Sequence, residues 1–289
     1  MFLLWYLYRF NYLVISEIDY NYYALAVSLM LLFGGFVLST ISWTYSLRVH
    51  GHIAGLRHGL ISHGLSVFAK YIPGKVWVIL GRASYMSGKG LSFKMASMVS
   101  LKEQLIYLLW GLILSCIPVF VFLKQPVYGL IVLLSVFIIG FILFSGWFHR
   151  QFVSTLTKVL KKKAELPLLT FNDALKISRF VVLYWLVWVF AFYFLLIAVF
   201  PEASFFYAFA FPVSVTYGVL AVFMPGGIGV RESILVAYLT AAGLSLEIAI
   251  TISVISRFWF IVGEVFLFLL ALVLKTIYKG ADYPGYPST

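Results

Sequence analysis

Ionisable side chains lie inside long apolar stretches of this sequence, where a charge is costly and usually serves a function. Lys102 and Glu103 lie about ten residues into one apolar run, and Arg257 lies about eleven residues into another. At about 1.5 Å per helical residue, these groups would lie about 15 Å deep, near the middle of a bilayer. Glu264 follows Arg257 on the same helical face. We expect all four to bind substrate, with an Arg257–Glu264 ion pair as the structural alternative.

Two Pro-Gly sequences interrupt other apolar stretches and are predicted to expose helix N-termini, whose unpaired N–H groups favour anions. Lys75 and Arg82 follow the first break, and Arg231 and Glu232 follow the second. A lipid phosphate is a plausible ligand, because arginine can hold it with two parallel hydrogen bonds. The alternatives are tight packing at the glycines, cations that reach the membrane interface, and an Arg231–Glu232 pair. The predicted turns are formed by Pro73, Gly74, Pro225, Gly226, Gly227 and Gly229.

Motifs for catalysis or metal binding are not recognised in the sequence. Four histidines lie close together in the sequence, at His50, His52, His58 and His63. Their spacing fits no zinc pattern and no cysteine lies nearby, so we expect an interfacial role. We predict no catalytic residue, no metal and no cofactor. Glu17 and Asp19 are the only carboxylates at an outer loop that would suit an enzyme acting on a lipid-linked sugar.

The elements that position these residues are predicted to be membrane helices. Hydrophobic residues make up 63% of the chain and charged residues 11%, against about half and a quarter in soluble domains. We therefore predict an all-α, polytopic membrane protein, with a single transmembrane domain over residues 1–289 and no soluble domain. Five apolar runs exceed the roughly 20 residues needed to cross a bilayer: about 24–47, 93–123, 127–148, 174–200 and 246–277.

Two further apolar stretches, 56–90 and 203–243, contain the Pro-Gly breaks near their middles. Proline and glycine together stop a helix, so we interpret both stretches as hairpins that enter and leave the membrane on one side. The sequence Gly-Leu-Ser recurs after each hairpin, at 90–92 and 243–245, and is followed by Ala and Ser at equal spacing. These matches predict an internal repeat, with copies at about 56–123 and about 203–277.

The charge pattern predicts the topology. If five runs cross and two hairpins do not, nearly all lysines and arginines lie on one face, which must be cytoplasmic. The C-terminus then lies in the cytoplasm, and the hairpins enter from opposite faces as two inverted re-entrant hairpins. That arrangement is typical of carriers with a site near the midplane. It also explains the net charge of +11 without nucleic acid. Residues 1–15 would form an outer interfacial helix or the end of a span.

Both Pro-Gly motifs resemble those of a known family. The segment 70–77, Lys-Tyr-Ile-Pro-Gly-Lys-Val-Trp, followed by Gly81-Arg82, is similar to the first signature of the lysylphosphatidylglycerol synthase transmembrane-region family. The segment 225–232, Pro-Gly-Gly-Ile-Gly-Val-Arg-Glu, is similar to the second. The motifs occur in the expected order, and the resemblance covers roughly residues 45–277.

The resemblance implies a flippase or transporter of a phospholipid or of a lipid-linked glycan precursor in the cytoplasmic membrane. The family includes the flippase part of the bacterial multiple peptide resistance factor, and its aminoacylating members carry a soluble domain after the membrane part. This sequence ends about a dozen residues after its last apolar run, so we expect no synthase activity. The implied partners are anionic or polyprenyl-phosphate-linked membrane lipids, together with a homo-oligomer or a biosynthetic complex. The alternatives are a membrane glycosyltransferase-like enzyme and an accessory subunit in lipid or cell-surface glycan biosynthesis.

Overall fold

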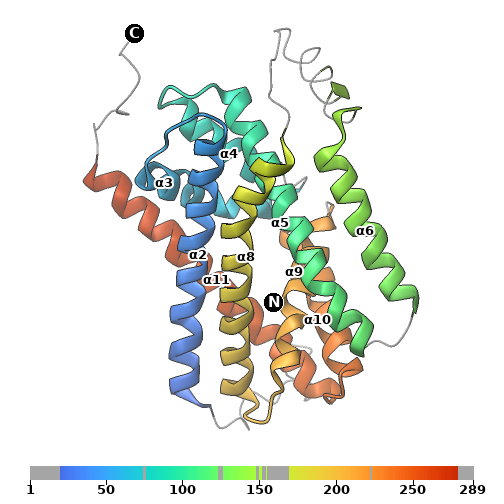
Figure 1. The fold of residues 1–289 in the computed structure, drawn as a ribbon. Coiled ribbons are helices and arrows are strands. Elements are labelled where there is room, and N and C mark those ends of the chain that lie inside the picture. The colour runs from blue at the N-terminus through green and yellow to red at the C-terminus, as the bar shows by residue number, and fades with distance from the viewer. Residues whose placement is uncertain are drawn as a thin grey trace.

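Helices account for all regular structure in the described part of the chain (Figure 1). The structure is a computed structural model and describes residues 20–73, 76–122, 126–147, 150–151, 154, 169–221 and 223–278. The predicted all-α class is therefore confirmed for these residues. The predictions made for residues 1–15, Glu17, Asp19, Gly74 and Lys75 lie outside them.

In the described part of the chain, five helices are long and apolar enough to cross a membrane, which confirms a multi-pass membrane protein. Their bounds agree with the predicted runs to within a few residues at most ends. In Figure 1, α2, α6 and α11 run upward, whereas α5 and α8 run downward. The five are α2 (Tyr22–Val49), α5 (Phe93–Phe122), α6 (Pro126–Phe144), α8 (Phe171–Val199) and α11 (Leu246–Ile277).

Both predicted helix breaks are present, and each separates two short helices. The first helix pair is α3 (Leu56–Ser66) and α4 (Trp77–Ser87), and the short 3-10 helix η2 (Val67–Tyr71) extends α3. The second helix pair is α9 (Ala210–Leu220) and α10 (Val230–Ala241), and it includes the short 3-10 helices η3 (Phe205–Phe209) before α9 and η4 (Pro225–Gly227) before α10. We call the described residues Tyr71–Pro73 and Val76 the first turn, and Ala221 with residues 223–229 the second turn. Gly226 and Gly227 have φ angles of 59° and 71°, which glycine adopts without the steric penalty of a Cβ.

The two helix pairs approach each other from opposite ends of the molecule. The first pair lies between the end of α2 and the start of α5, which are both at the upper end in Figure 1. The second pair lies between the end of α8 and the start of α11, at the lower end. Their turns meet inside the molecule, where η2 contacts η4.

Small residues bring the long helices into close contact, as is common in membrane proteins. A Cβ on Gly35 of α2 would overlap the Trp188 indole of α8, and one on Gly263 of α11 would overlap the Phe36 ring of α2. In the same interface between α2 and α8, the Ser28 hydroxyl donates to the Ala191 carbonyl oxygen at 2.6 Å. Through these contacts α2, α8 and α11 pack closely together, and the two helix pairs pack against them.

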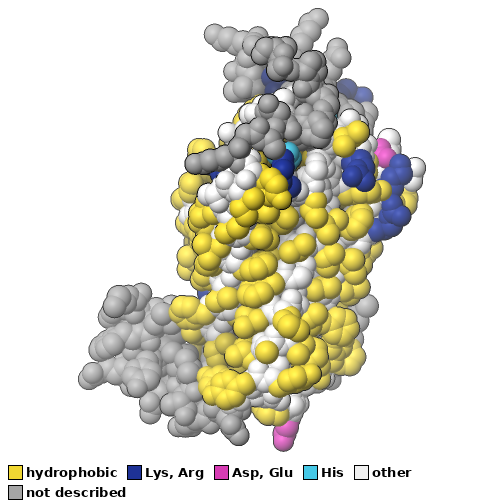
Figure 2. All heavy atoms as spheres, turned by 90° about the vertical axis from the view of Figure 1, so that its left-hand side faces the viewer, with side chains coloured by type: hydrophobic (Ala, Val, Ile, Leu, Met, Phe, Trp, Pro, Cys, Tyr) yellow, Lys and Arg dark blue, Asp and Glu magenta, His cyan; other side chains and the backbone are white. Residues whose placement is uncertain are grey.

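The outer surface suits a lipid environment. Large hydrophobic side chains are exposed along α6, α8 and α11, and Figure 2 shows hydrophobic side chains covering the middle of the molecule. On the same face, lysine and arginine side chains gather near the upper end. This face therefore has an apolar band with basic groups toward one end.

Candidate functional site

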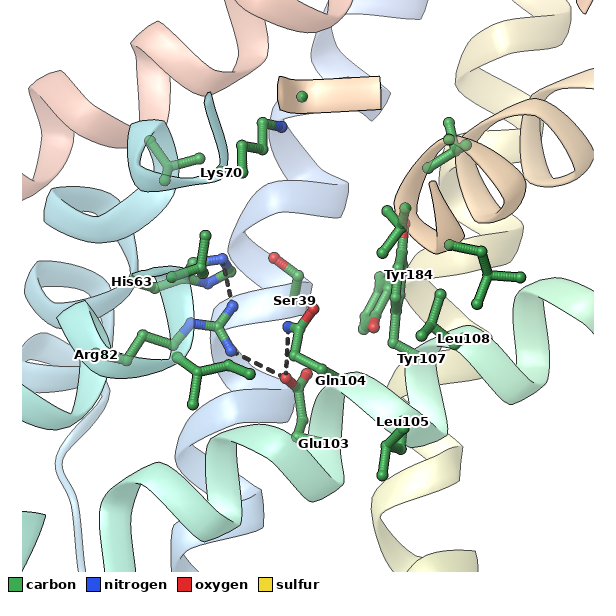
Figure 3. Close-up of a pocket in the computed structure, with 18 of the residues that line it drawn as sticks. Ser39, His63, Lys70, Arg82, Glu103, Gln104, Leu105, Tyr107, Leu108 and Tyr184 are labelled. Atoms are coloured by element: carbon green, nitrogen blue, oxygen red, sulfur yellow. Dashed lines mark hydrogen bonds and ion pairs between the residues drawn. The ribbon is translucent and has the colours of Figure 1, made fainter. Parts of the chain in front are cut away.

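A cavity of about 390 Å³ lies where the two helix pairs meet (Figure 3). Both pairs contribute to its wall, together with α2, α5, α8 and α11. Most of the lining is apolar or aromatic, and a few polar groups converge on it, which is the usual make-up of a ligand site. Among the described residues, the charged side chains of the lining are Lys70, Arg82, Glu103 and Arg231.

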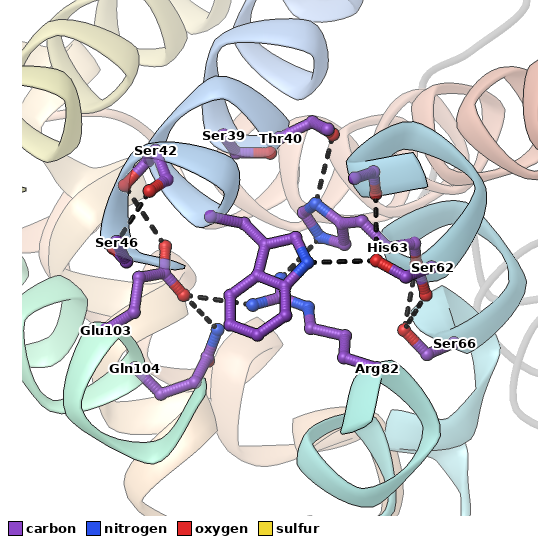
Figure 4. A network of polar contacts seen from close by, with 12 residues as sticks. Ser39, Thr40, Ser42, Ser46, Ser62, His63, Ser66, Arg82, Glu103 and Gln104 are labelled. Atoms are coloured by element: carbon purple, nitrogen blue, oxygen red, sulfur yellow. Dashed lines mark hydrogen bonds and ion pairs between the residues drawn. The ribbon is translucent and has the colours of Figure 1, made fainter. Parts of the chain in front are cut away.

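Arg82 and Glu103 form a buried ion pair between α4 and α5. Arg82 Nη1 lies 2.9 Å from Glu103 Oε2, and the two residues are 2% and 1% exposed. The same carboxylate accepts hydrogen bonds from Ser42 Oγ at 3.3 Å and from Gln104 Nε2 at 3.2 Å (Figures 3 and 4). These extra bonds matter because a buried ion pair must recover the hydration that both ions lose. The pair places two predicted binding residues in one cavity wall.

His63 of α3 extends this network to α2. Arg82 Nη2 lies 2.7 Å from His63 Nε2, and a guanidinium can only donate, so Nε2 must be the acceptor. The proton is therefore on Nδ1, which donates to Thr40 Oγ1 at 3.1 Å (Figure 4). Burial, followed by the charge of Arg82, lowers the pKa of His63 well below its usual value. His63 is 7% exposed, and its spacing in the sequence gave no signal for this role.

Glu264 of α11 contacts the first turn rather than Arg257. It forms an ion pair with Lys70 and accepts a hydrogen bond from the Tyr71 hydroxyl at 2.8 Å. The Arg257–Glu264 pair, the structural alternative to substrate binding, is therefore not formed, although both residues lie on α11. Lys70 was not among the predicted binding residues. Its position just before the Pro-Gly sequence is the feature that could have indicated a role in binding.

Arg257 instead contacts the second turn. Its Nη1 donates to the Gly226 carbonyl oxygen at 3.2 Å and lies 3.7 Å from Glu232 Oε1. Glu232 Oε2 accepts a hydrogen bond from the Gly229 N–H at 2.7 Å and so caps α10. The alternative Arg231–Glu232 pair is absent among the described contacts, because Glu232 is turned toward Arg257. The N–H of Gly229 is also no longer free for an external anion, which corrects that part of the anion-site prediction.

Arg231 is buried without a counter-ion. It is 6% exposed, and its guanidinium carbon lies 4.6 Å from the centre of the Phe260 ring and 5.3 Å from that of Phe211. Within the described part of the chain, Nη2 has no hydrogen-bond partner and no carboxylate lies within ion-pair distance. Burial, followed by the charge of Arg257, lowers the pKa of Arg231 to about 10. The side chain therefore still presents a positive charge to the cavity at neutral pH.

Lys102, the remaining described member of the predicted binding set, lies apart from the cavity. It is 5% exposed and is not among the described residues that line the wall, although its neighbour Glu103 is. Adjacent residues on a helix point about 100° apart, which explains why only one of the two reaches the site. Among the described residues, no group of three metal-binding side chains is found.

Comparison with known proteins identifies the family of this chain. Neither the curated proteins nor the solved structures contain a match to the sequence. Residues 2–274, nearly the whole chain, match the model of the lysylphosphatidylglycerol synthase TM region. Both Pro-Gly turns and all the charged residues of the cavity lie within this match, and the chain therefore belongs to the lysylphosphatidylglycerol synthase transmembrane-region family.

Proposed function

We propose that this chain is a flippase that moves a phospholipid or a lipid-linked glycan precursor between the two leaflets of the cytoplasmic membrane. The carrying observation is the cavity at the meeting point of the two turns, with cationic Lys70, Arg82 and Arg231 in a mostly apolar wall. A lipid headgroup needs polar contacts while its chains stay in an apolar environment. In this proposal the chain performs no covalent chemistry.

The proposal treats both helix pairs as re-entrant hairpins. The helices α3, α4 and α9 have 11 residues each and α10 has 12. At about 1.5 Å per residue they reach roughly 17 Å, little more than half of a hydrocarbon core of about 30 Å. Their approach from opposite ends supports an inverted repeat with copies at about 56–123 and 203–277. Alternate opening on either side of a central site is the usual mechanism of such folds.

We further propose that the upper end in Figure 1 is cytoplasmic. Arg48, Lys94, Lys176 and Lys275 lie within the first or last two turns of spans at that end, and lysine and arginine favour the cytoplasmic side. Labelling with a membrane-impermeant thiol reagent tests this orientation, using Gly51→Cys and Glu202→Cys in a chain with Cys116→Ser. The first should react only from the cytoplasm and the second only from outside; the reverse pattern would invert the orientation.

The flippase proposal is tested by transbilayer movement of fluorescent lipids in liposomes that contain the purified protein. Phosphatidylglycerol and a polyprenyl phosphate represent the two substrate classes. We expect at least one of them to equilibrate between leaflets faster than in protein-free vesicles. The Arg82→Gln/Glu103→Gln variant, which removes a cavity ion pair without changing net charge, should slow this movement. Movement no faster than in protein-free vesicles for both lipids would refute the proposal.

A further inference from the structure

His63 is a titratable side chain that lines the cavity and contacts Arg82 on the same wall (Figure 3). Its Nε2 carries no proton and accepts from Arg82 Nη2, while its Nδ1–H donates to the Thr40 hydroxyl of α2. A charged histidine donates from both ring nitrogens, so a proton on Nε2 would make two donors face each other. Protonation of His63 therefore breaks its bond to Arg82 and frees Nη2 for another acceptor.

Charged groups on the elements around α3 decide when that proton can bind. Among the described residues, the cations close enough to act on His63 are Arg82 of α4 and Lys70 of η2. Each is already paired with a carboxylate, Arg82 with Glu103 of α5 and Lys70 with Glu264 of α11. The surroundings of the neutral His63 ring are thus balanced, and a proton on the ring would leave one positive charge without a counter-ion.

The empty cavity resists this additional charge, and a bound anion favours it. Arg231 on the same cavity already has no carboxylate within ion-pair distance in the described part of the chain, and like charges repel strongly in an apolar wall. An anion offsets one of these charges and offers acceptors to the freed Arg82, whose Nε also has no hydrogen-bond partner among the described residues. Anion and proton therefore favour each other's binding, each by the same factor.

We propose that His63 is a proton-binding site coupled to anion binding, so that the chain moves one proton with each anionic headgroup. This inference rests on the proposed flippase function and concerns its energy source, not its substrate. The proton passes from water in the cavity to Nε2 of His63, Arg82 Nη2 exchanges that nitrogen for the anion, and Glu103 stays bound to Nη1. When the anion leaves on the other side, the proton returns to water there. One negative and one positive charge cross together, which removes the cost of moving a net charge against the membrane potential.

Solid-state NMR of protein labelled with 15N-histidine measures the protonation of each ring nitrogen and tests the site independently of transport. The chain has five histidines, and the His63 signals are those missing from His63→Gln. The probes are vesicles of phosphatidylcholine alone and vesicles with added phosphatidylglycerol or polyprenyl monophosphate. In phosphatidylcholine at neutral pH we expect a neutral ring protonated on Nδ1. One of the anionic lipids should raise the midpoint of the His63 titration by about one pH unit or more.

His58 is the internal control, because an anionic membrane surface concentrates protons near every histidine. It lies on the same helix and is 5% exposed, but it is not among the described residues that line the cavity. A larger rise of the titration midpoint at His63 than at His58 is the expected result. An equal rise at the two histidines, or no rise at His63 with either anionic lipid, would overturn the inference.

Lipid movement under an imposed pH gradient measures the coupling itself. The vesicle lumen is made one pH unit more alkaline than the medium, with the membrane potential clamped at zero. One proton per lipid then predicts about tenfold enrichment in the inner leaflet of the fluorescent lipid that moves, phosphatidylglycerol or polyprenyl phosphate, because one pH unit is tenfold in proton concentration. His63→Gln, which can still accept from Arg82, should show no enrichment, and His58→Gln should match the parent.

The outcomes separate the coupling from the flippase function. Movement by the parent without enrichment, or enrichment by folded His63→Gln, would overturn the inference and leave the flippase function standing. If neither lipid moves, the flippase function fails, and the NMR titration alone decides the proton site.

Discussion

The aromatic ring of Tyr71 lies against the α-carbon of Gly226, and this contact joins the two turns at the centre of the molecule. A Cβ at Gly226 would lie 2.6 Å from Cδ1 and Cε1 of that ring and 3.1 Å from Arg257 Nη2. The Tyr71 hydroxyl is held by Glu264 at 2.8 Å, so the ring cannot easily move aside. The two helix pairs therefore meet at Tyr71, whose ring is held in place, and at Gly226, which has no side chain.

We expect Gly226→Ala to slow lipid movement strongly. The added methyl group overlaps Tyr71, and alanine must also adopt a φ of 59°, which is strained for residues with a Cβ. Overpacking and backbone strain together should destabilise the meeting of the turns by about 1–3 kcal/mol. Transport per folded protein is the measurement, with Gly34→Ala as control because no atom lies within 4 Å of its added Cβ. Equal rates for the two variants would contradict this role.

Removing one carboxylate and removing the unpaired arginine should affect stability in opposite ways. Glu103→Gln leaves the buried Arg82 without its counter-ion, and breaking such a pair commonly costs about 3–5 kcal/mol. Arg231→Gln removes a charge that has no partner among the described residues, so its stability should match or exceed that of the parent. Thermal unfolding in detergent, without added lipid, compares them. Similar losses in both variants would mean that Arg231 has a structural partner.

Removing the charge of Glu264 should shift lipid preference. Glu264→Gln leaves Lys70 without its ion-pair partner and adds one positive charge beside the cavity, so the relative affinity for phosphatidic acid over phosphatidylglycerol should rise by about threefold or more. The matched control is the Lys70→Met/Glu264→Gln variant, which removes the whole pair and restores the net charge of the parent. Competition binding of the two lipids measures the ratio. A ratio that follows the loss of Glu264 in both variants would show that charge balance does not set the preference.

His63 should make stability depend on pH. Its pKa is lowered in the folded protein by burial and then by Arg82, whereas in the unfolded chain it is about 6.5. The unfolded state therefore takes up a proton first as the pH falls, so this stability is complete above about pH 6.5 and declines below it. The parent should lose stability between about pH 6.5 and 5.5, and His63→Gln, which can still accept from Arg82, should lose less. Parallel pH profiles for the two proteins would assign the effect to other groups.

Spans and breaks follow from local sequence, and for that reason they were predictable. The run at 246–277 coincides with α11, because length and apolarity alone decide whether a helix can cross a bilayer. The break after Met224 appears at η4, because proline and glycine act on the backbone next to them. The same reasoning placed Glu103, Arg231 and Arg257 inside the membrane part of the chain, although it could not say which of them would meet.

The sequence by itself determined the membrane class, the five spans, the family and which residues are ionisable within apolar segments. Only the tertiary structure decided the partners of those charges. Glu264 pairs with Lys70, 194 positions away in the chain, and Arg257 contacts Gly226 across two elements. Arg231 keeps no ion-pair partner among the described residues, because Glu232, its sequence neighbour, caps α10 and faces Arg257. Ion pairing depends on distances of a few ångströms between separate helices, and helix packing sets those distances, whereas composition and spacing do not.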